Sequence, residues 1–200
     1  MTDLDFDLIM KARQELVEVS REAFARNLTS ATSGNTSLRV PGYPEQVLIK
    51  ATGRCFGDVE PQDFLLMDLD GNILMGNGVP SKEYRFHLGI FKKRPDVQAV
   101  FHGHSAYATA YAMAKGALPV TTAAAEVGLN KIAVVGFAPP GSEELAQMVI
   151  DAFADPQLKA AVMLRHGFIT VGNSIRQAFY LADVLEDNAK VAFLLDQLQK

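Results

Sequence analysis

The sequence has little cysteine and no excess of basic charge. Cys55 is the only cysteine, so the chain cannot form an internal disulfide, which is typical of a protein from a reducing compartment. Lysine and arginine together number 19 against 23 aspartates and glutamates, and the net charge is −4. This balance provides no basic stripe for a nucleic-acid backbone, so we expect no nucleic-acid partner.

The sequence also lacks a long hydrophobic run and the motifs of several large enzyme classes. No apolar segment approaches the ~18 residues of a membrane span, and the acidic N-terminus lacks the basic region of a signal peptide. We therefore expect no membrane partner and a cytoplasmic location. A Gly-x-Ser-x-Gly elbow, a Walker loop and a Gly-x-Gly-x-x-Gly motif after a strand are all missing, which argues against hydrolase, kinase and Rossmann dehydrogenase functions.

The chain has enough apolar residues for one sizeable core, because 48% of its 200 residues are hydrophobic. No repeat, low-complexity tract or charged linker divides it, so we expect a single domain over residues 1–200. Helices are predicted over residues 5–27, from Ser81 to just before Pro95, over 105–115, and after the capping residues Ser142 and Ser174.

Strands are predicted over residues 36–40, 46–51, 64–68, 73–75, up to His102, and over 120–122, 132–135 and 160–166. The dipeptide Asp70-Gly71 between two of them is a strong hairpin signal. Because strands and helices mix without strict alternation, the pattern predicts an α/β fold with a single, largely antiparallel central sheet covered by helices.

Histidine is scarce, and three of the four histidines lie at predicted strand ends. His102 and His104 are two residues apart, so both side chains point to the same face and can bind one ion. His166 ends another apolar run and is followed by glycine, as His102 is. A single histidine is more often a hydrogen-bonded structural residue, and we interpret His87, one turn after Glu83, in that way. Three imidazoles with one open coordination position are typical of catalytic zinc, so the other three histidines are the predicted metal ligands.

Three turns rich in glycine and hydroxyl residues predict an anion site. Residues 32–37, 51–53 and 79–83 each offer backbone N–H groups and small hydroxyls where the chain can approach an anion closely. One such segment alone is usually only a turn, but the three together suggest a phosphate pocket. Residues 81–83 are expected in the first turn of their helix, where the N–H groups and the dipole favour an anion and Lys82 adds positive charge.

Glu83 is the candidate acid/base. A carboxylate in the first helical turn is usually a surface residue that matches the helix dipole. If Glu83 instead points at the metal, it can move a proton while a divalent ion polarises a ketone oxygen and stabilises an enediolate.

Five separated motifs resemble one enzyme family. They are Gly34-Asn35-x-Ser37, Thr52-Gly53, Pro80-Ser81-x-Glu83, His102-x-His104 and Leu164-x-His166-Gly167. Their order and spacing resemble the class II aldolase/adducin-head family, and most nearly its L-fuculose-phosphate aldolase-like enzymes. The resemblance extends from the first predicted helix to the last.

The resemblance implies a metal-dependent aldolase. It implies that Zn²⁺, or another divalent transition metal, is held by His102, His104 and His166, and that Glu83 serves as acid/base. The residues that match the family's phosphate site are Asn35, Thr52, Gly53 and Ser81. Such enzymes reversibly cleave a phosphorylated ketose to dihydroxyacetone phosphate and an aldehyde. They are typically homotetramers with active sites at subunit interfaces.

Two departures from the family pattern leave other reactions open. Lys82 replaces a second serine, as in the tetronate-phosphate decarboxylase-like branch, and we count it among the expected substrate-binding residues. Residues 119–128 lack the tyrosine that helps to protonate the aldehyde-side oxygen in the aldolases. The aldehyde-side acid is then Glu126 or a residue of a neighbouring subunit.

Three further members of the family remain as alternatives. Glu126 lies near the position of a catalytic glutamate in the methylthioribulose-phosphate dehydratase-like branch, so dehydration stays open. The 4-epimerase-like members usually carry aspartate at the position of Glu83. A non-catalytic adducin-type role is disfavoured, because adducin heads have lost the metal ligands that this chain retains.

Overall fold

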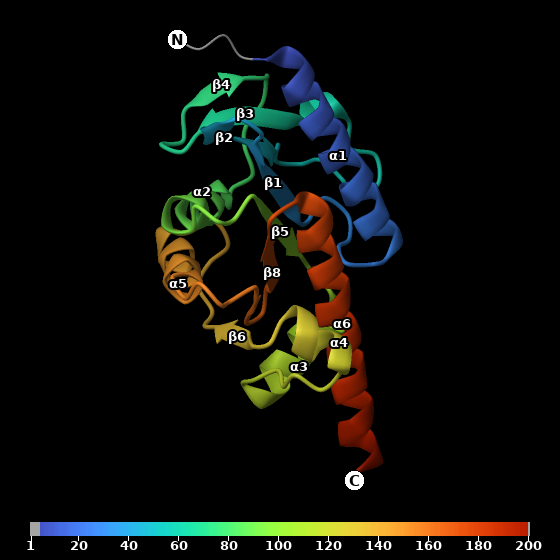
Figure 1. Ribbon diagram of the computed structural model, residues 1–200. Helices are drawn as coiled ribbons and strands as arrows, with labels where there is room; N and C mark the ends of the chain where they lie inside the picture. Colours follow the sequence, from blue (N-terminus) through green and yellow to red (C-terminus); the bar gives the residue numbers. More distant parts are fainter. Residues whose placement is uncertain (1–4, 200) are drawn as a thin grey trace.

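A sheet of eight strands forms the centre of the computed structural model, which describes residues 5–199 (Figure 1). The strands are β1 (Asn35–Val40), β2 (Tyr43–Lys50), β3 (Phe64–Asp68), β4 (Ile73–Met75), β5 (Ala99–Gly103), β6 (Ile132–Val135), β7 (Ala160–Met163) and β8 (Gly167–Gly172). The helices are α1 (Phe6–Ala25), α2 (Tyr84–Lys93), α3 (Ala106–Lys115), α4 (Ala123–Gly128), α5 (Glu143–Phe153) and α6 (Ile175–Leu198), with a short 3-10 turn at Pro61–Asp63.

The strand order is β4-β3-β2-β1-β5-β8-β7-β6, and only the β6–β7 pair is parallel. This confirms the expected α/β fold with a largely antiparallel sheet. Strand β5 is central, with β1 on one side and β8 on the other. The register places Asn35 of β1 and Ile169 of β8 opposite His102 of β5, so that segments distant in sequence meet at this end of the sheet.

Helices cover both faces of the sheet, because alternate strand residues are apolar on both sides. Phe101 and Phe168 pack into one core with α1, α3, α4 and α6, whereas their neighbours Val100 and Ile169 pack into a second core with α2 and α5. Figure 1 shows α1 and α6 on one side of the sheet and α2 and α5 on the other.

The predicted strand over residues 120–122 is wrong. The N–H groups of Thr121 and Thr122 donate to the side-chain oxygen of Asn188 on α6, at 2.8 and 3.1 Å, instead of to a neighbouring strand. Thr122 also caps the unpredicted helix α4, since its hydroxyl accepts from the N–H of Ala125. The predicted strand over 160–166 ends at Met163, and the chain turns there into β8, which the sequence had not indicated.

Helix α2 begins three residues later than predicted. The N–H of Ser81 donates to the carbonyl of Lys50 at 3.0 Å, which holds residue 81 against the end of β2. Residues 81–83 form a turn, and the first helical residue is Tyr84. The expectation that Ser81, Lys82 and Glu83 lie in the first helical turn is therefore wrong.

The predicted hairpin at Asp70-Gly71 is confirmed. Asp70-Gly71 joins β3 to β4 as an antiparallel hairpin, and Asp5 caps α1 by accepting from the N–H groups of Asp7 and Leu8. Gly116 ends α3 in a left-handed conformation with φ of 70°. None of the helices within residues 5–199 is long and apolar enough to cross a lipid bilayer.

Candidate metal centre and anion-binding cleft

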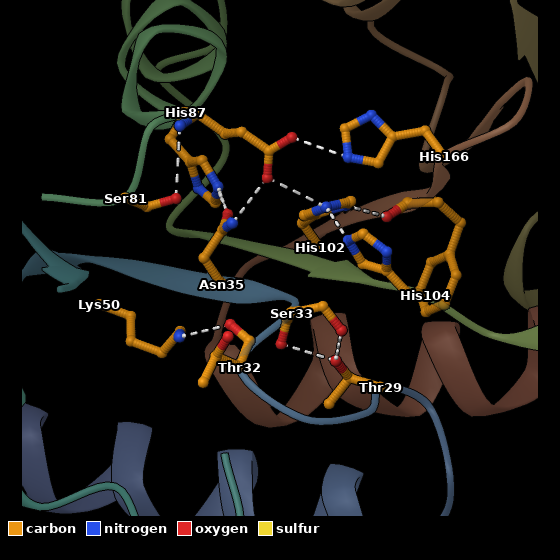
Figure 2. Close-up of polar contacts among 12 residues, drawn as sticks. Thr29, Thr32, Ser33, Asn35, Lys50, Ser81, His87, His102, His104 and His166 are labelled. Atoms are coloured by element: carbon orange, nitrogen blue, oxygen red, sulfur yellow. Dashed lines mark hydrogen bonds and ion pairs between the residues drawn. The ribbon is translucent and has the colours of Figure 1, made fainter. Parts of the chain in front are cut away.

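Four side chains that can bind a metal ion converge at one end of the sheet: Glu83, His102, His104 and His166. One ligand atom from each lies within 4.8 Å of the other three. His102 comes from the end of β5, His104 follows it, His166 lies in the turn between β7 and β8, and Glu83 directly precedes α2. In Figure 2 the three histidine rings face a common centre.

Two glycines allow these strand ends to approach closely. A Cβ atom at Gly167 would lie 2.2 Å from the carbonyl oxygen of Gly103. A Cβ atom at Gly103 would lie 2.6 Å from the carbonyl oxygen of Leu28 and 2.6 Å from the Phe168 ring. Side chains at either position would separate the strands, so the glycine between His102 and His104 and the glycine after His166 bring the three rings together.

The donor set fits a divalent transition metal ion. His102 Nδ1 lies 2.8 Å from the carbonyl oxygen of Phe168, which can only accept, so Nδ1 carries the proton and Nε2 presents a lone pair to the centre. Metal-bound histidines usually donate their second N–H in this way. His104 Nε2 lies 2.9 Å from His102 Nε2, and Glu83 Oε1 lies 2.8 Å from His166 Nε2 without hydrogen-bond alignment. Three imidazoles and one carboxylate are typical ligands of zinc and related metals.

The protonation states also suit metal binding. Burial alone raises the pKa of Glu83, but the neighbouring His102 and His166 outweigh burial and lower it well below its usual value. Burial, together with His102 and His166, lowers the pKa of His104 to about 3. At neutral pH the cluster therefore contains an ionised carboxylate and a neutral His104, as metal coordination requires. The assignment of the three histidines as ligands stays a prediction that this geometry fits, and the structure adds Glu83 as a residue that could provide a fourth ligand.

A buried chain of hydrogen bonds positions Glu83. The side-chain N–H of Asn35 donates to Glu83 Oε2 at 2.8 Å, and Asn35 Oδ1 accepts from His87 Nε2. His87 Nδ1 in turn accepts from the hydroxyl of Ser37 at 2.7 Å. His87 is fully buried, and burial, with a smaller contribution from His102, lowers its pKa to about 3, so it is neutral. His87 therefore has the structural role expected for it, and its hydrogen-bond partners are Asn35 and Ser37.

A cleft of about 300 Å³ opens beside the cluster. Glu83, His104 and His166 line it, whereas His102 is fully buried beneath. The residues expected to bind substrate all line the same cleft: Asn35, Thr52, Gly53, Ser81 and Lys82. The structure therefore brings together every site residue predicted from the sequence apart from Glu126.

The chain also matches a known protein family. The family model for the class II aldolase and adducin N-terminal domain matches residues 14–193. The chain belongs to this family. Membership and the relatives below make the protein an enzyme of the aldolase type, a carbon–carbon lyase.

The relatives of this class II aldolase include enzymes with different reactions. The chain is 31% identical over 185 residues to an L-fuculose phosphate aldolase of Methanococcus maripaludis, covering 92% of this chain and 98% of that protein. It is 30% identical over 188 residues to a 3-oxo-tetronate 4-phosphate decarboxylase of Escherichia coli K12, covering 92% and 86%. The structure of L-fuculose-1-phosphate aldolase from Thermus thermophilus superimposes with a TM-score of 0.82 at 25% identity, covering 94% and 96%.

The late start of α2 changes how the aldolase can hold an anion. The N–H groups of Ser81 and Thr52 already donate to main-chain carbonyls, those of Lys50 and Val79. If these residues bind an anion as predicted, they do so through their hydroxyl groups rather than through a free helix N-terminus. Lys82 is exposed and adds its charge from the rim of the cleft.

Lys50 lines the cleft and was missed by the sequence reasoning. Its side chain is 1% exposed, and Nζ donates to the carbonyl of Arg54 and, at 3.5 Å, to that of Thr32. Burial lowers the pKa of Lys50 to about 8. Figure 2 shows Lys50 reaching Thr32, so this lysine holds together two of the turns that form the cleft. The sequence did contain a signal for this role, because Lys50 ends an apolar strand just before the glycine turn at residues 51–53.

Arg165 also lines the cleft and was likewise missed. It occupies the variable position of the Leu164-x-His166 motif, where the sequence offered no indication of a role. Glu126, by contrast, lies on α4, which packs against α6, and is not among the residues that line the cleft. Within one chain it is therefore not placed to act as the aldehyde-side acid.

Proposed function

We propose that this enzyme reversibly cleaves a phosphorylated ketose between C3 and C4, giving dihydroxyacetone phosphate and an aldehyde. The observation that carries the proposal is the buried Glu83 carboxylate, which lies against the three histidines and lines the cleft. A divalent ion, with Zn²⁺ as the proposed metal, supplies Lewis-acid stabilisation of the negative charge that develops on the ketone oxygen. His102, His104 and His166 would hold it, with the Glu83 carboxylate beside them.

Glu83 is the proposed acid/base. When the C3–C4 bond breaks, C3 must gain a proton, and the reverse reaction must remove that proton again. Asn35 holds Glu83 Oε2 at 2.8 Å, which fixes the carboxylate and leaves Oε1 without an aligned hydrogen bond. We assign the proton transfer to Oε1, because a fixed carboxylate beside the reacting carbon avoids the cost of reorienting it.

The phosphate of the substrate is proposed to bind on the β1–β2 side of the cleft. The hydroxyls of Thr52 and Ser81, the side chain of Asn35 and the main chain at Gly53 line the cleft near the ends of β1 and β2, where the N–H of Ser81 donates to the carbonyl of Lys50, and Lys82 adds its charge from the rim. Hydroxyl groups and a single lysine charge are common partners of a phosphate group. The relatives support this assignment, because their names describe enzymes that act on phosphorylated substrates.

We also propose a homotetramer with active sites at subunit interfaces, acting in the cytoplasm. Large apolar side chains are exposed on α3 and α6: Tyr107, Met113, Phe193 and Leu194. Exposed apolar groups of this size mark association surfaces. Light scattering of the purified protein tests the assembly, and a monomer that is fully active would contradict it.

The reaction is tested with zinc-loaded enzyme, dihydroxyacetone phosphate and a panel of aldehydes. Formation of a phosphorylated ketose, and its cleavage in the reverse direction, is the expected result. If no aldehyde is accepted and no ketose phosphate is cleaved, the aldol proposal fails.

Decarboxylation of a 3-oxo-tetronate 4-phosphate is the second candidate. In that reaction the C1–C2 bond breaks, its electron pair moves toward the C3 oxygen, CO₂ leaves, and C2 gains a proton to give dihydroxyacetone phosphate. The departing CO₂ needs no proton, so this reaction suits a cleft that Glu126 does not line, in a chain whose residues 119–128 include no tyrosine. Lys82 and the similarity to the E. coli decarboxylase also favour it. Release of CO₂ from this substrate distinguishes the two reactions.

A further inference from the structure

The cleft holds more positive charge than a phosphate group at one end needs. Lys50, Lys82 and Arg165 line it, and the only carboxylate among its lining residues is Glu83, which belongs to the metal cluster. Lys50 donates to two main-chain carbonyls, and Lys82 stands beside Ser81, where the phosphate is proposed to bind. Arg165 is the cation of the cleft that neither donates to a main-chain carbonyl of the described residues nor has a part in the proposed function.

The guanidinium group of Arg165 has no acidic partner within residues 5–199. Its one described contact is with the ring of Phe137, 4.5 Å from the ring centroid. Stacking on an aromatic ring restricts the side chain while leaving its N–H donors free to bind a ligand. Arg165 is exposed, so these donors are accessible from the cleft.

The backbone fixes Arg165 beside a predicted metal ligand. Its φ is +59°, in the left-handed region that residues with a Cβ rarely adopt. The turn that imposes this conformation is closed by the β7–β8 pairing of Met163 with Gly167 and by the N–H of His166, which donates to Met163 at 3.2 Å. Glycine or asparagine is the usual residue at such a position. An arginine there raises the conformational energy of the backbone, which a turn with no other role would not require.

The strand order places Arg165 across the metal cluster from the phosphate side. Asn35 and Thr52 lie at β1 and after β2, His104 follows the central strand β5, and Arg165 lies in the β7–β8 turn. A substrate with its phosphate on the β1–β2 side and its reacting carbons at the cluster has its other end near Arg165.

We infer that Arg165 determines specificity by binding a carboxylate at the end of the substrate remote from the phosphate. This inference rests on the proposed function and deepens it, because it names the substrate class as phosphorylated sugar acids. The planar guanidinium group matches a carboxylate with two parallel hydrogen bonds. The inference holds whether the carboxylate leaves as CO₂ or remains on the aldehyde product.

Binding to zinc-loaded enzyme tests the inference without relying on turnover. The probes are erythronate 4-phosphate and erythritol 4-phosphate, which differ only in having a carboxylate or a hydroxymethyl group at C1. Calorimetry should show that the wild-type enzyme binds the acid about 10- to 100-fold more tightly, the range of a charge-assisted hydrogen bond.

Arg165→Asn is the informative variant, because asparagine tolerates the left-handed backbone while removing the charge. It should bind the two probes with similar affinity and keep the wild-type affinity for erythritol 4-phosphate. Arg85→Gln is the matched control, since Arg85 is also exposed and stacks on an aromatic ring, that of Tyr84 at 5.0 Å, but does not line the cleft. This control should keep the preference for the acid.

Two results would overturn the inference: equal affinity of the wild-type enzyme for both probes, or a preference for the acid that survives in Arg165→Asn. Either leaves the proposed function standing if the enzyme still cleaves a ketose phosphate or accepts an aldehyde. Failure of the wild-type enzyme to bind either probe would instead contradict the proposed phosphate site and the inference together.

Discussion

The two sides of the cleft are built differently. On the side of β1 and α2, the polar side chains of Asn35, Ser37 and His87 are buried and bonded to one another, and they end at Glu83. On the side of the β7–β8 turn, Arg165 is exposed and His166 Nδ1 has no hydrogen-bond partner among the described residues. The first side is fixed by internal contacts, whereas on the second the exposed guanidinium group of Arg165 has N–H donors that a ligand can reach.

This difference suggests that the two sides have different roles: the β1 side carries out the proton transfer, and the β7–β8 side selects the substrate. A group that transfers protons must be held in one orientation, and buried hydrogen bonds provide that. A group that recognises the variable end of a substrate needs unpaired donors that the ligand can satisfy. We therefore expect substitutions on the β1 side to lower turnover on every substrate, and substitutions on the β7–β8 side to change which substrate is preferred.

The largest effect is expected for His104→Ala. His104 is a proposed metal ligand that follows the central strand β5, between the two sides of the cleft. Loss of one of three imidazoles should abolish stoichiometric zinc binding and lower kcat by more than ~10³-fold. Metal analysis of the purified protein, together with an activity assay, measures both quantities. Wild-type zinc content in this variant would contradict the ligand assignment.

Glu83→Gln tests the chemistry of the fixed side. Glutamine keeps the size of the side chain and one potential oxygen ligand but cannot transfer the proton. The three histidines should retain zinc, while kcat falls by about 10²- to 10⁴-fold, the usual contribution of a general acid/base. Full activity in the presence of bound zinc would show that another group transfers the proton.

Asn35→Ala tests whether the buried hydrogen bonds position Glu83. The variant removes the donor to Glu83 Oε2 and the acceptor of His87 Nε2. Loss of such a supporting contact should lower kcat by about 10- to 100-fold with similar effects on all substrates. A variant that loses affinity for phosphate but keeps its kcat would place Asn35 in substrate binding alone. Arg85→Gln, which lies outside the cleft, should leave kcat unchanged.

The smallest effect is expected on stability. The pKa of His87 is lowered from 6.5 to about 3, chiefly by burial, so between these pH values the unfolded chain binds a proton there and the folded chain does not. The free energy of unfolding contributed by His87 is therefore lost as pH falls below 6.5. Thermal unfolding of the metal-free protein should show a lower Tm at pH 5 than at pH 7, with a shallower dependence in His87→Gln. Equal pH dependence in both proteins would show that His87 is not buried in its neutral form.

Local sequence signals predicted much of the fold and of the cluster. The histidines stand at strand ends beside glycines, and His-Gly-His places two rings on one face by strand geometry alone. Asp70-Gly71 likewise specifies its hairpin within a few residues.

Contacts between distant residues account for what the sequence did not indicate. The segment around Thr121 looked like a strand, but Asn188, which lies far along the chain, satisfies its N–H groups. The carbonyl of Lys50 accepts from Ser81 and delays the start of α2 in the same way. The role of the Asn35 amide in holding Glu83 depends on α2 packing over β1, which no single segment reveals.

Zinc titration of chelator-treated enzyme tests the central claim most directly. Because the four clustered side chains offer one set of ligands, activity should be lost on metal removal and should return in proportion to added zinc, with a plateau at one ion per chain. Full activity of the metal-free enzyme would contradict the account.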